Sequence, residues 1–479
     1  MATPIPDNQC EFTLVDAAAI TGGRLHGDAS IATRGVSIDT RAVAPGALFV
    51  ALRSASGDGH DYLRQAPQRG AAAAIVETGR IHAGIPCIEV ADTLVALGQL
   101  ARRHLARVRD AHPLPTIAIG GAAGKTSTKE LTAAAARTVF GPTLSTPGNL
   151  NNRIGVPMTI FTLTDNHRAA VLECGTNLRG EIASLAAIVE PDAALVLNVD
   201  LEHTEGLGTL DDVADEEAAL FSTARRFAVT SSDEPLVLAR IPSHLQRITF
   251  GKSAGSDVRL DRRAFGADGR ARVRVALSPS LRGNNDPNLD FEIGLLGETA
   301  ALNCAAAIAG VAAMRGQPFA ARELLAIADA LAAVQPVAGR LATLSIRGVH
   351  VIDDTYNSNP RSIRAALAAA REVADGLGAR LVIAMGDMLE LGALSLDAHV
   401  ASVRDVMREQ AAAFVAVGPE MRAAVATIIR SEPAANIDTV SDSVAAGKLI
   451  ASIVRPGDVL LLKGSRGMAM ERILDSLRP

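Results

Sequence analysis

A short glycine-rich run in the sequence has the composition of a phosphate-binding loop. The run reads Gly120-Gly121-Ala122-Ala123-Gly124-Lys125-Thr126-Ser127, between an apolar segment typical of a strand and a segment typical of a helix. A glycine turn at a helix N-terminus directs several backbone N–H groups to one point, which suits a polyphosphate such as that of ATP. Lys125 would neutralise the β- and γ-phosphates, and the Thr126 hydroxyl would ligate Mg²⁺. Ile119 occupies the place of the first glycine in the strict spacing, so a plain glycine turn with a surface lysine is the alternative.

Two residues with metal-binding side chains follow further predicted strands. Glu173 ends the apolar run 169–173, and His203 lies just beyond the apolar run 193–199. In a doubly wound sheet, ligands bind outside the carboxyl ends of the strands, so both residues should face the phosphate loop. A carboxylate and an imidazole can hold Mg²⁺ ions that bridge nucleotide oxygens. A lone histidine at a strand end is more often a capping or solvated residue, and only the convergence of three strand ends favours the metal site.

Two amide-rich segments have the composition of loops that line a substrate. The first spans residues 146–155 and contains Asn149 and Asn152, although an ordinary Asn/Gly turn explains it equally well. The second reads Asp353-Asp354-Thr355-Tyr356-Asn357-Ser358-Asn359-Pro360. Asn359 also has the type and place of an N-cap, with Pro360 as the first residue of the helix. The segments 386–388 and 463–466 follow strands as well, so they should lie on the same edge of their sheet.

Strands and helices must hold these loops in place, and the chain divides into three α/β regions. Residues 1–112 mix short apolar runs with turn signals, and two prolines end this region. Residues 113–335 alternate strand, glycine turn and helix, which predicts a parallel sheet with helices on both faces. Here we expect a strand over 116–120 and a helix over 125–139. Residues 336–479 repeat the pattern in a smaller, Rossmann-like unit.

The composition excludes several other classes of protein. The net charge is −5, aromatic residues make up 3% and Trp is absent, so neither a basic surface nor stacking side chains favour nucleic acid. The longest charge-free apolar stretch, 299–314, is shorter than the roughly 20 residues that cross a bilayer. No basic region followed by an apolar run marks the N-terminus. The four cysteines are isolated, which favours a reducing compartment. We therefore expect a cytoplasmic protein with no nucleic-acid partner and no membrane span.

The order and spacing of these motifs resemble the Mur ligases of peptidoglycan synthesis over nearly the full chain. The segments that carry the resemblance are VSIDTR at 36–41, DGH at 58–60, the GKT loop, GNLNN at 148–152, residues 198–203, DDTYNSNP at 353–360, GDMLELG at 386–392 and KGSR at 463–466. Within this family, the YNSNP segment favours the ligase that adds D-alanyl-D-alanine over the sibling that adds the third amino acid of the peptide.

The resemblance implies an ATP-dependent, Mg²⁺-assisted ligase that works as a monomer. ATP would convert the terminal carboxylate of UDP-N-acetylmuramoyl-tripeptide to an acyl phosphate, which the amine of D-alanyl-D-alanine would attack. The first domain would hold the UDP-sugar and the second would bind ATP. The third would contact the ATP ribose, bind the incoming dipeptide and close over the centre. The residues implied are Asp39, Arg41, Asp58 and His60 at the UDP-sugar, Asn303 at adenine, Arg340 and Asp354 at the nucleotide, and Asn149, Asn152, Asn357, Asn359 and Lys463 at the substrates.

One departure from the family concerns its carbamylated lysine, whose position here is Glu217. No lysine lies between Lys129 and Lys252, so no shift of register supplies one. We expect Glu217 to provide the carboxylate directly, as a catalytic residue beside Lys125 and His203 and as a Mg²⁺ ligand beside Thr126, Glu173 and His203. The alternative is that Glu217 shares a solvated helix face with acids 212, 215 and 216. The alternative function is a catalytically weakened relative that binds a UDP-sugar peptide as a scaffold or partner subunit.

Overall fold

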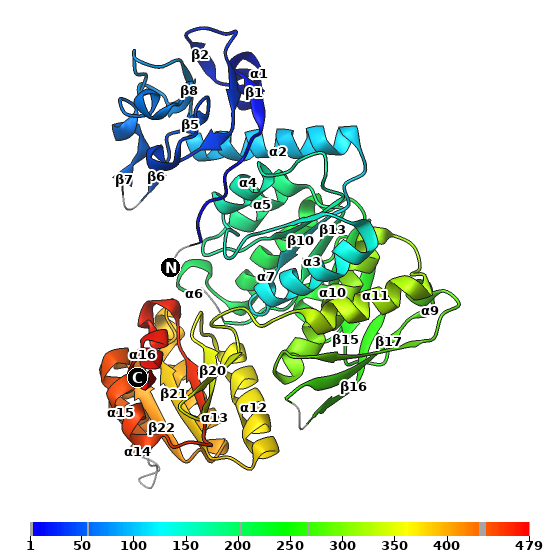
Figure 1. Ribbon diagram of the computed structural model, residues 1–479, viewed down its shortest axis with the longest axis vertical. Helices are drawn as coiled ribbons and strands as arrows, with labels where there is room; N and C mark the ends of the chain where they lie inside the picture. Colours follow the sequence, from blue (N-terminus) through cyan, green and yellow to red (C-terminus); the bar gives the residue numbers. More distant parts are fainter. Residues whose placement is uncertain (1–2, 55–56, 202–203, 267–268, 431–436, 479) are drawn as a thin grey trace.

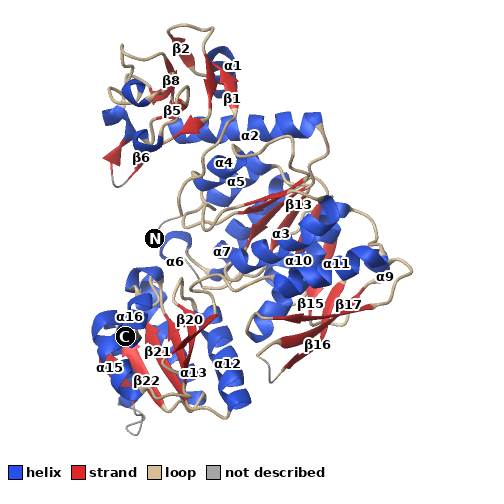
Figure 2. Ribbon diagram, in the orientation of Figure 1, coloured by secondary structure: helices blue, strands red, loops and turns tan. Residues whose placement is uncertain are grey.

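The computed structural model describes residues 3–54, 57–201, 204–266, 269–430 and 437–478. Three α/β units follow one another along the chain and also in space (Figure 1), with the first at the top of the view and the third at the bottom. Each unit has its own sheet with helices beside it (Figure 2). The fold class predicted from the sequence is confirmed.

The first unit has a small five-stranded sheet in the order β2-β9-β8-β5-β4, in which only β2 runs antiparallel to its neighbour. Its strands are β2 (Arg24–His26), β4 (Val36–Ser37), β5 (Leu48–Val50), β8 (Ala73–Glu77) and β9 (Cys87–Val90). The pairs β1 (Glu11–Thr13) with β3 (Ala32–Arg34) and β6 (Arg53–Ser54) with β7 (Gly57–Asp58) flank the sheet. The helices are α1 (Leu14–Thr21) and α2 (Thr93–Ala111), and the side chain of Asp92 caps α2.

The second unit contains a nine-stranded sheet in the order β11-β12-β10-β13-β14-β15-β16-β17-β18. The strands from β11 to β16 run parallel, and β16 to β18 form an antiparallel extension. The strands are β10 (Thr116–Gly120), β11 (Thr143–Ser145), β12 (Ala169–Glu173), β13 (Ala193–Val196), β14 (Phe227–Ser231), β15 (Gln246–Gly251), β16 (Val258–Phe265), β17 (Ala271–Leu277) and β18 (Asn288–Ile293). Strand order reverses around β10, because the chain goes first to β11 and β12 on one side and then to β13 on the other. Such a reversal opens a crevice at the carboxyl ends of the strands.

Helices cover both faces of this sheet, as predicted. They are α3 (Lys125–Phe140), α4 (Gly155–Ile160), α5 (Glu181–Val189), α6 (Thr204–Leu207), α7 (Leu210–Ala218), α8 (Pro235–Leu238), α9 (Pro279–Arg282), α10 (Gly297–Arg315) and α11 (Ala321–Ala333). Alternate residues of β10 point into different cores: Ala118 packs with the first unit and α5, whereas Ile117 and Ile119 pack with α3 and α10. Among the described residues, α10 is the one helix long and apolar enough to span a membrane, but 83% of that stretch is buried in this core.

The third unit has a six-stranded sheet in the order β19-β20-β24-β21-β22-β23, parallel except for β19. Its strands are β19 (Ala342–Ile346), β20 (Val349–Asp354), β21 (Leu381–Gly386), β22 (Ala413–Val417), β23 (Ile437–Val440) and β24 (Val459–Lys463). Its helices are α12 (Pro360–Leu377), α13 (Ser395–Arg408), α14 (Pro419–Ile429), α15 (Ser443–Ile453) and α16 (Ile473–Leu477). Asn359 caps α12 through the N–H of Ser362, and Pro360 is the first helical residue, as predicted.

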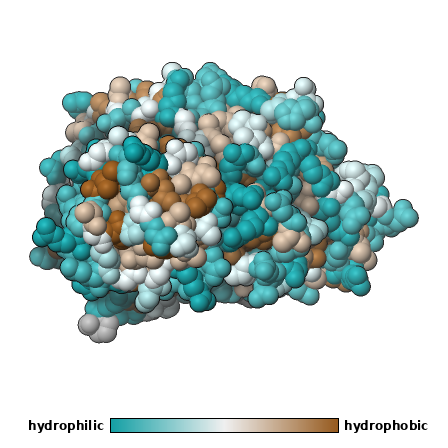
Figure 3. All heavy atoms as spheres, turned by 90° about the horizontal axis from the view of Figure 1, so that it is seen from above, coloured by the Kyte–Doolittle hydropathy of each residue, from teal (hydrophilic) through white to brown (hydrophobic). Residues whose placement is uncertain are grey.

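Figure 3 shows the surface at the end of the molecule that carries the first unit. Hydrophilic residues cover most of this face, and apolar residues gather in a smaller area within it. All four cysteines lie buried as free thiols.

Candidate active site

The glycine-rich run forms the predicted strand–turn–helix loop between β10 and α3. Gly121 and Gly124 have φ values of 119° and 89°, a region that favours glycine over other residues. A Cβ on Gly121 would also lie 2.9 Å from the backbone nitrogen of Leu197, so the loop packs tightly against the chain after β13. The Lys125 ammonium donates a hydrogen bond to the carbonyl of Gly121 and therefore lies over the loop that it follows.

Asn198 fixes the middle of this loop from the neighbouring strand. Its Oδ1 accepts a hydrogen bond from the N–H of Ala123 and its Nδ2 donates one to the carbonyl of the same residue, each at 2.9 Å. The predicted strand 193–199 is three residues too long, because the chain leaves the sheet after Val196 and thereby turns Asn198 toward the loop. Asn198 was not predicted to have a role of its own, although its place just after a strand could have indicated one.

Glu173 lies at the end of β12, 1% exposed, and is held beside the helix that follows the phosphate loop. Its Oε1 accepts hydrogen bonds from the hydroxyl of Thr126 at 3.1 Å and from Nδ2 of Asn151 at 2.8 Å. Its Oε2 is buried and has no hydrogen-bond partner among the described residues. A buried carboxylate oxygen without a partner is costly unless a cation completes its shell. Carboxylate and hydroxyl oxygens are ligands that Mg²⁺ prefers, so Glu173 and Thr126 fit the metal that the sequence resemblance implies.

Glu217 on α7 is buried, 3% exposed, and its Oε2 accepts a hydrogen bond from the N–H of Gly121 at 2.6 Å. The solvated-face alternative is therefore wrong for this residue. It is also wrong for Glu216, whose carboxylate accepts hydrogen bonds from the N–H groups of Gly180 and Ile182 at 2.7 and 2.8 Å. His203, the other predicted catalytic residue on this segment, lies outside the described residues. No cluster of three or more His, Cys, Asp or Glu suited to a metal occurs in the part of the chain that the structure describes.

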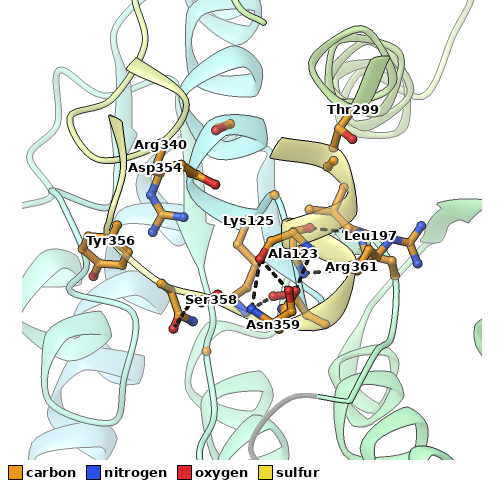
Figure 4. Close-up of a pocket in the computed structure, with 18 of the residues that line it drawn as sticks. Ala123, Lys125, Leu197, Thr299, Arg340, Asp354, Tyr356, Ser358, Asn359 and Arg361 are labelled. Atoms are coloured by element: carbon orange, nitrogen blue, oxygen red, sulfur yellow. Dashed lines mark hydrogen bonds between the residues drawn. The ribbon is translucent and has the colours of Figure 1, made fainter. Parts of the chain in front are cut away.

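The third unit forms the opposite wall of the site (Figure 4). Arg340 and Asp354 lie on one side of Lys125, and Asn359 and Arg361 lie on the other. The Arg340 guanidinium lies 4.2 Å from the ring centre of Tyr356. The Lys463 ammonium, only 1% exposed, donates to Asp354 Oδ2 at 2.6 Å and to the carbonyl of Asn357 at 3.0 Å. Lys463 therefore holds the Asp354 loop in place.

A cavity of about 590 Å³ separates the two walls. The predicted residues that line it are Ala122, Ala123, Gly124, Lys125, Ser127, Asn149, Asn152, Glu173, Asn303, Arg340, Asp354, Asn357, Asn359 and Lys463. Asn303 on α10 approaches the loop so closely that a Cβ on Gly124 would lie 3.0 Å from its Oδ1. Asn149 and Asn152 also have other partners: Asn149 Oδ1 accepts a hydrogen bond from the hydroxyl of Thr3, 146 residues earlier in the chain, at 2.6 Å, and Asn152 Oδ1 accepts one from the nearby N–H of Gly155 at 2.8 Å.

The candidates in the first unit do not line this cavity. Asp39 and Arg41 pair with each other at 2.6 Å near the surface. His60 is 7% exposed, and both of its ring nitrogens have internal partners, the Asp58 carboxylate at 2.6 Å and the N–H of Glu77 at 2.9 Å. Desolvation raises the pKa of the Asp58 carboxyl, but hydrogen bonds from His60 and Arg80 outweigh it and hold that pKa at about 2.

Direct contacts join the second and third units around the cavity. The N–H of Arg361 donates to Asp200 Oδ2 at 2.7 Å, and the Arg361 guanidinium pairs with Glu234 at 2.5 Å. Farther out, Arg263 of β16 pairs with Glu372 of α12 at 2.6 Å. These contacts were not predicted, because nothing local in these segments indicates a partner more than 100 residues away.

The fold and the site together define a nucleotide-binding α/β protein. A phosphate loop from one domain and charged residues from the next face each other across one cavity. This is the arrangement of an enzyme that binds its nucleotide between two domains that close on each other.

Comparisons with known proteins give the family. The Mur ligase middle domain matches residues 119–311, the "Mur ligase, glutamate ligase domain" matches 339–466, and the "Mur ligase family, catalytic domain" matches 33–105. The UDP-N-acetylmuramoyl-tripeptide–D-alanyl-D-alanine ligase of Escherichia coli (strain K12) is 33% identical over 97% of this chain and 98% of its own. The ligase of the same name from Treponema pallidum (strain Nichols) is 32% identical over 93% and 94%.

Solved structures agree with the sequence matches. A crystal structure of MurF from Acinetobacter baumannii has a TM-score of 0.86 at 28% identity and covers 98% of this chain and 99% of its own. MurF ligase from Thermotoga maritima in complex with ADP has a TM-score of 0.78 at 25% identity, over 92% and 96%. The chain belongs to the Mur ligase family.

Proposed function

We propose that this protein is an ATP-dependent ligase that joins D-alanyl-D-alanine to UDP-N-acetylmuramoyl-tripeptide in peptidoglycan precursor synthesis. The observation that carries the proposal is the shared cavity in which Lys125 faces Arg340 and Asp354. The two substrates are those that the names of its relatives state. The ADP complex of a structural neighbour supports nucleotide binding in this fold.

The predicted site residues would have separate roles in phosphoryl transfer. The backbone N–H groups from Gly121 to Ser127 and the Lys125 ammonium would hold the phosphates and offset the charge on the transferring group. Thr126 and Glu173 would hold Mg²⁺, with Glu217 and His203 as further proposed ligands. Bound there, the ion would neutralise charge that develops on the phosphate oxygens. Asn303 would contact adenine, and Arg340 and Asp354 would contact the nucleotide from the third domain.

Joining the peptide requires the tripeptide carboxylate and the dipeptide amine to meet beside the transferred phosphoryl group. We propose that the amide-rich loops with Asn149, Asn152, Asn357 and Asn359 orient these two groups, supported by Lys463. Contacts such as that between Arg361 and Asp200 would keep the domains closed, so that water does not hydrolyse the acyl phosphate. Asp39, Arg41, Asp58 and His60 would shape the UDP-sugar site of the first domain.

We also propose domain limits of 1–112, 113–335 and 336–479, a cytoplasmic location and a monomeric state. The first limit is supported by its place in the segment between α2 and β10, and the second by its place between α11 and β19. The four buried free thiols are compatible with a reducing compartment. Sedimentation of the purified protein would test the monomer.

A coupled phosphate-release assay with ATP, UDP-N-acetylmuramoyl-tripeptide and D-alanyl-D-alanine tests the function. We expect phosphate release that requires all three substrates and Mg²⁺. A folded protein that binds the UDP-sugar peptide but releases no phosphate would instead support the weakened, scaffold-like relative. The buried carboxylate of Glu173 and the intact phosphate loop favour the enzyme.

A further inference from the structure

The glycine at the end of β10 is not required by its own backbone. Gly120 lies in an extended strand and is absent from the glycines with positive φ. A glycine in a strand forfeits side-chain packing and loses more entropy on folding than other residues do, so it usually marks a close approach by another group. Here the nearest group is Glu217, because a Cβ on Gly120 would lie 2.8 Å from Glu217 Oε2, whereas the next atom, Leu220 Cδ2, would lie 3.2 Å away.

The same carboxylate oxygen is bound to the next residue of the loop. Glu217 Oε2 accepts the N–H of Gly121 at 2.6 Å, and the carbonyl of Gly121 accepts a hydrogen bond from the Lys125 ammonium. A continuous chain of contacts therefore runs from α7 through Gly121 to Lys125. Glu217 is 3% exposed, so water does not compete for this hydrogen bond, which raises the penalty for losing it.

We infer that Gly120 and Glu217 form one positioning unit for the phosphate loop. The missing side chain at position 120 provides the space that the Glu217 carboxylate occupies, and the carboxylate fixes the Gly121 peptide, which in turn orients Lys125. This role depends on a hydrogen-bond acceptor at position 217 and not on a charge or on CO₂. This inference deepens the proposed function. It rests on that function in one respect, because the loop must bind ATP for the ligase reaction.

The test separates the acceptor from the charge by comparing two variants of one residue. Glu217→Gln keeps an oxygen that can accept the Gly121 N–H, whereas Glu217→Ala removes it, and both remove the negative charge. We expect ADP, titrated calorimetrically in EDTA, to bind Glu217→Ala about 10-fold more weakly than Glu217→Gln. Hydrogen exchange should show the Gly121 amide protected in the wild type and in Glu217→Gln and faster in Glu217→Ala. Equal affinities and equal exchange in the two variants would overturn the inference.

A double-mutant cycle tests the steric half of the inference. Gly120→Ala should weaken ADP binding about 10-fold in the wild-type background, because its Cβ displaces the carboxylate, but less than about 2-fold in the Glu217→Ala background. Gly255→Ala is the matched control, since a Cβ there meets nothing within 4 Å. A Gly120→Ala effect of the same size in both backgrounds would refute the coupling. If Glu217→Gln binds ADP normally but loses Mg²⁺-dependent turnover, Glu217 both positions the phosphate loop and acts as the proposed Mg²⁺ ligand. A wild-type protein without turnover would refute only the proposed function.

Discussion

Replacing Glu173 by Gln should make the metal-free protein more stable and at the same time inactivate it. The wild-type carboxylate is buried, and its Oε2 lacks a hydrogen-bond partner among the described residues, whereas Oε1 has two. Gln keeps Oε1 for the Thr126 hydroxyl and the Asn151 amide and removes the uncompensated charge. Burying an unsatisfied acceptor costs about 1–3 kcal/mol, and more for a charged group. Because the Gln amide N–H group lacks a partner in turn, we expect a net gain of roughly 1–2 kcal/mol.

The assay is thermal unfolding in EDTA and again with Mg²⁺ and ADP. A gain of this size should raise the unfolding midpoint in EDTA by roughly 2–8 °C for a domain of about this size. Mg²⁺ with ADP should stabilise the wild type, because a ligand that binds only the folded state shifts unfolding to higher temperature. It should stabilise Glu173→Gln much less, and kcat/KM should fall at least about 100-fold.

Glu216→Gln is the matched control, because Glu216 is also buried but both of its oxygens accept hydrogen bonds from backbone N–H groups. The Gln amide would place an N–H against one of these donors, so this variant should lower the midpoint in EDTA. Opposite signs for two chemically identical substitutions are the expected result. A lower midpoint for Glu173→Gln in EDTA, or an undiminished response to Mg²⁺, would refute the assignment of Glu173 to the metal.

Three further predictions concern other parts of the chain. Lys125→Ala should lower kcat/KM, with a loss of transition-state stabilisation of about 3 kcal/mol or more, while circular dichroism shows an intact fold. Near-normal turnover would exclude the phosphate contact. Asp354→Ala, which also frees Lys463 from its ion pair, should raise the KM for ATP and leave calorimetric UDP-sugar affinity unchanged; a collapse of that affinity would contradict the division of labour among domains. Burial lowers the pKa of His104 from 6.5 to about 4. The unfolded state therefore binds the proton more tightly than the folded state does, so the free energy of unfolding should fall by up to about 3 kcal/mol as the pH decreases from 6.5 to about 4. His104→Gln should flatten this part of the urea-unfolding pH profile, and an unchanged slope would contradict it.

The local elements of the fold could be predicted because their causes are local. Alternating and continuous apolar runs gave the strands on both sides of the phosphate loop, and the glycine turn gave the start of α3. Asn359 and Pro360 marked the start of α12, since an N-cap side chain and a first-turn proline act within four residues. The resemblance to a family added the order of the domains and the candidates for each substrate.

The contacts that make these elements a site depend on tertiary structure. Hydrogen bonds join Asn198 to Ala123, Glu217 to Gly121, and Arg361 to Asp200. The partners are 75, 96 and 161 residues apart in the sequence. No periodicity of 2 or 3.6 residues carries information over such separations, because it reports only which face of one element is apolar. The sequence by itself determined that position 217 is a glutamate, where the resemblance to the family implies a lysine. Only the packing of α7 against the end of β10 decided that its carboxylate is buried and bound to the phosphate loop, because the missing side chain of Gly120 leaves room for it.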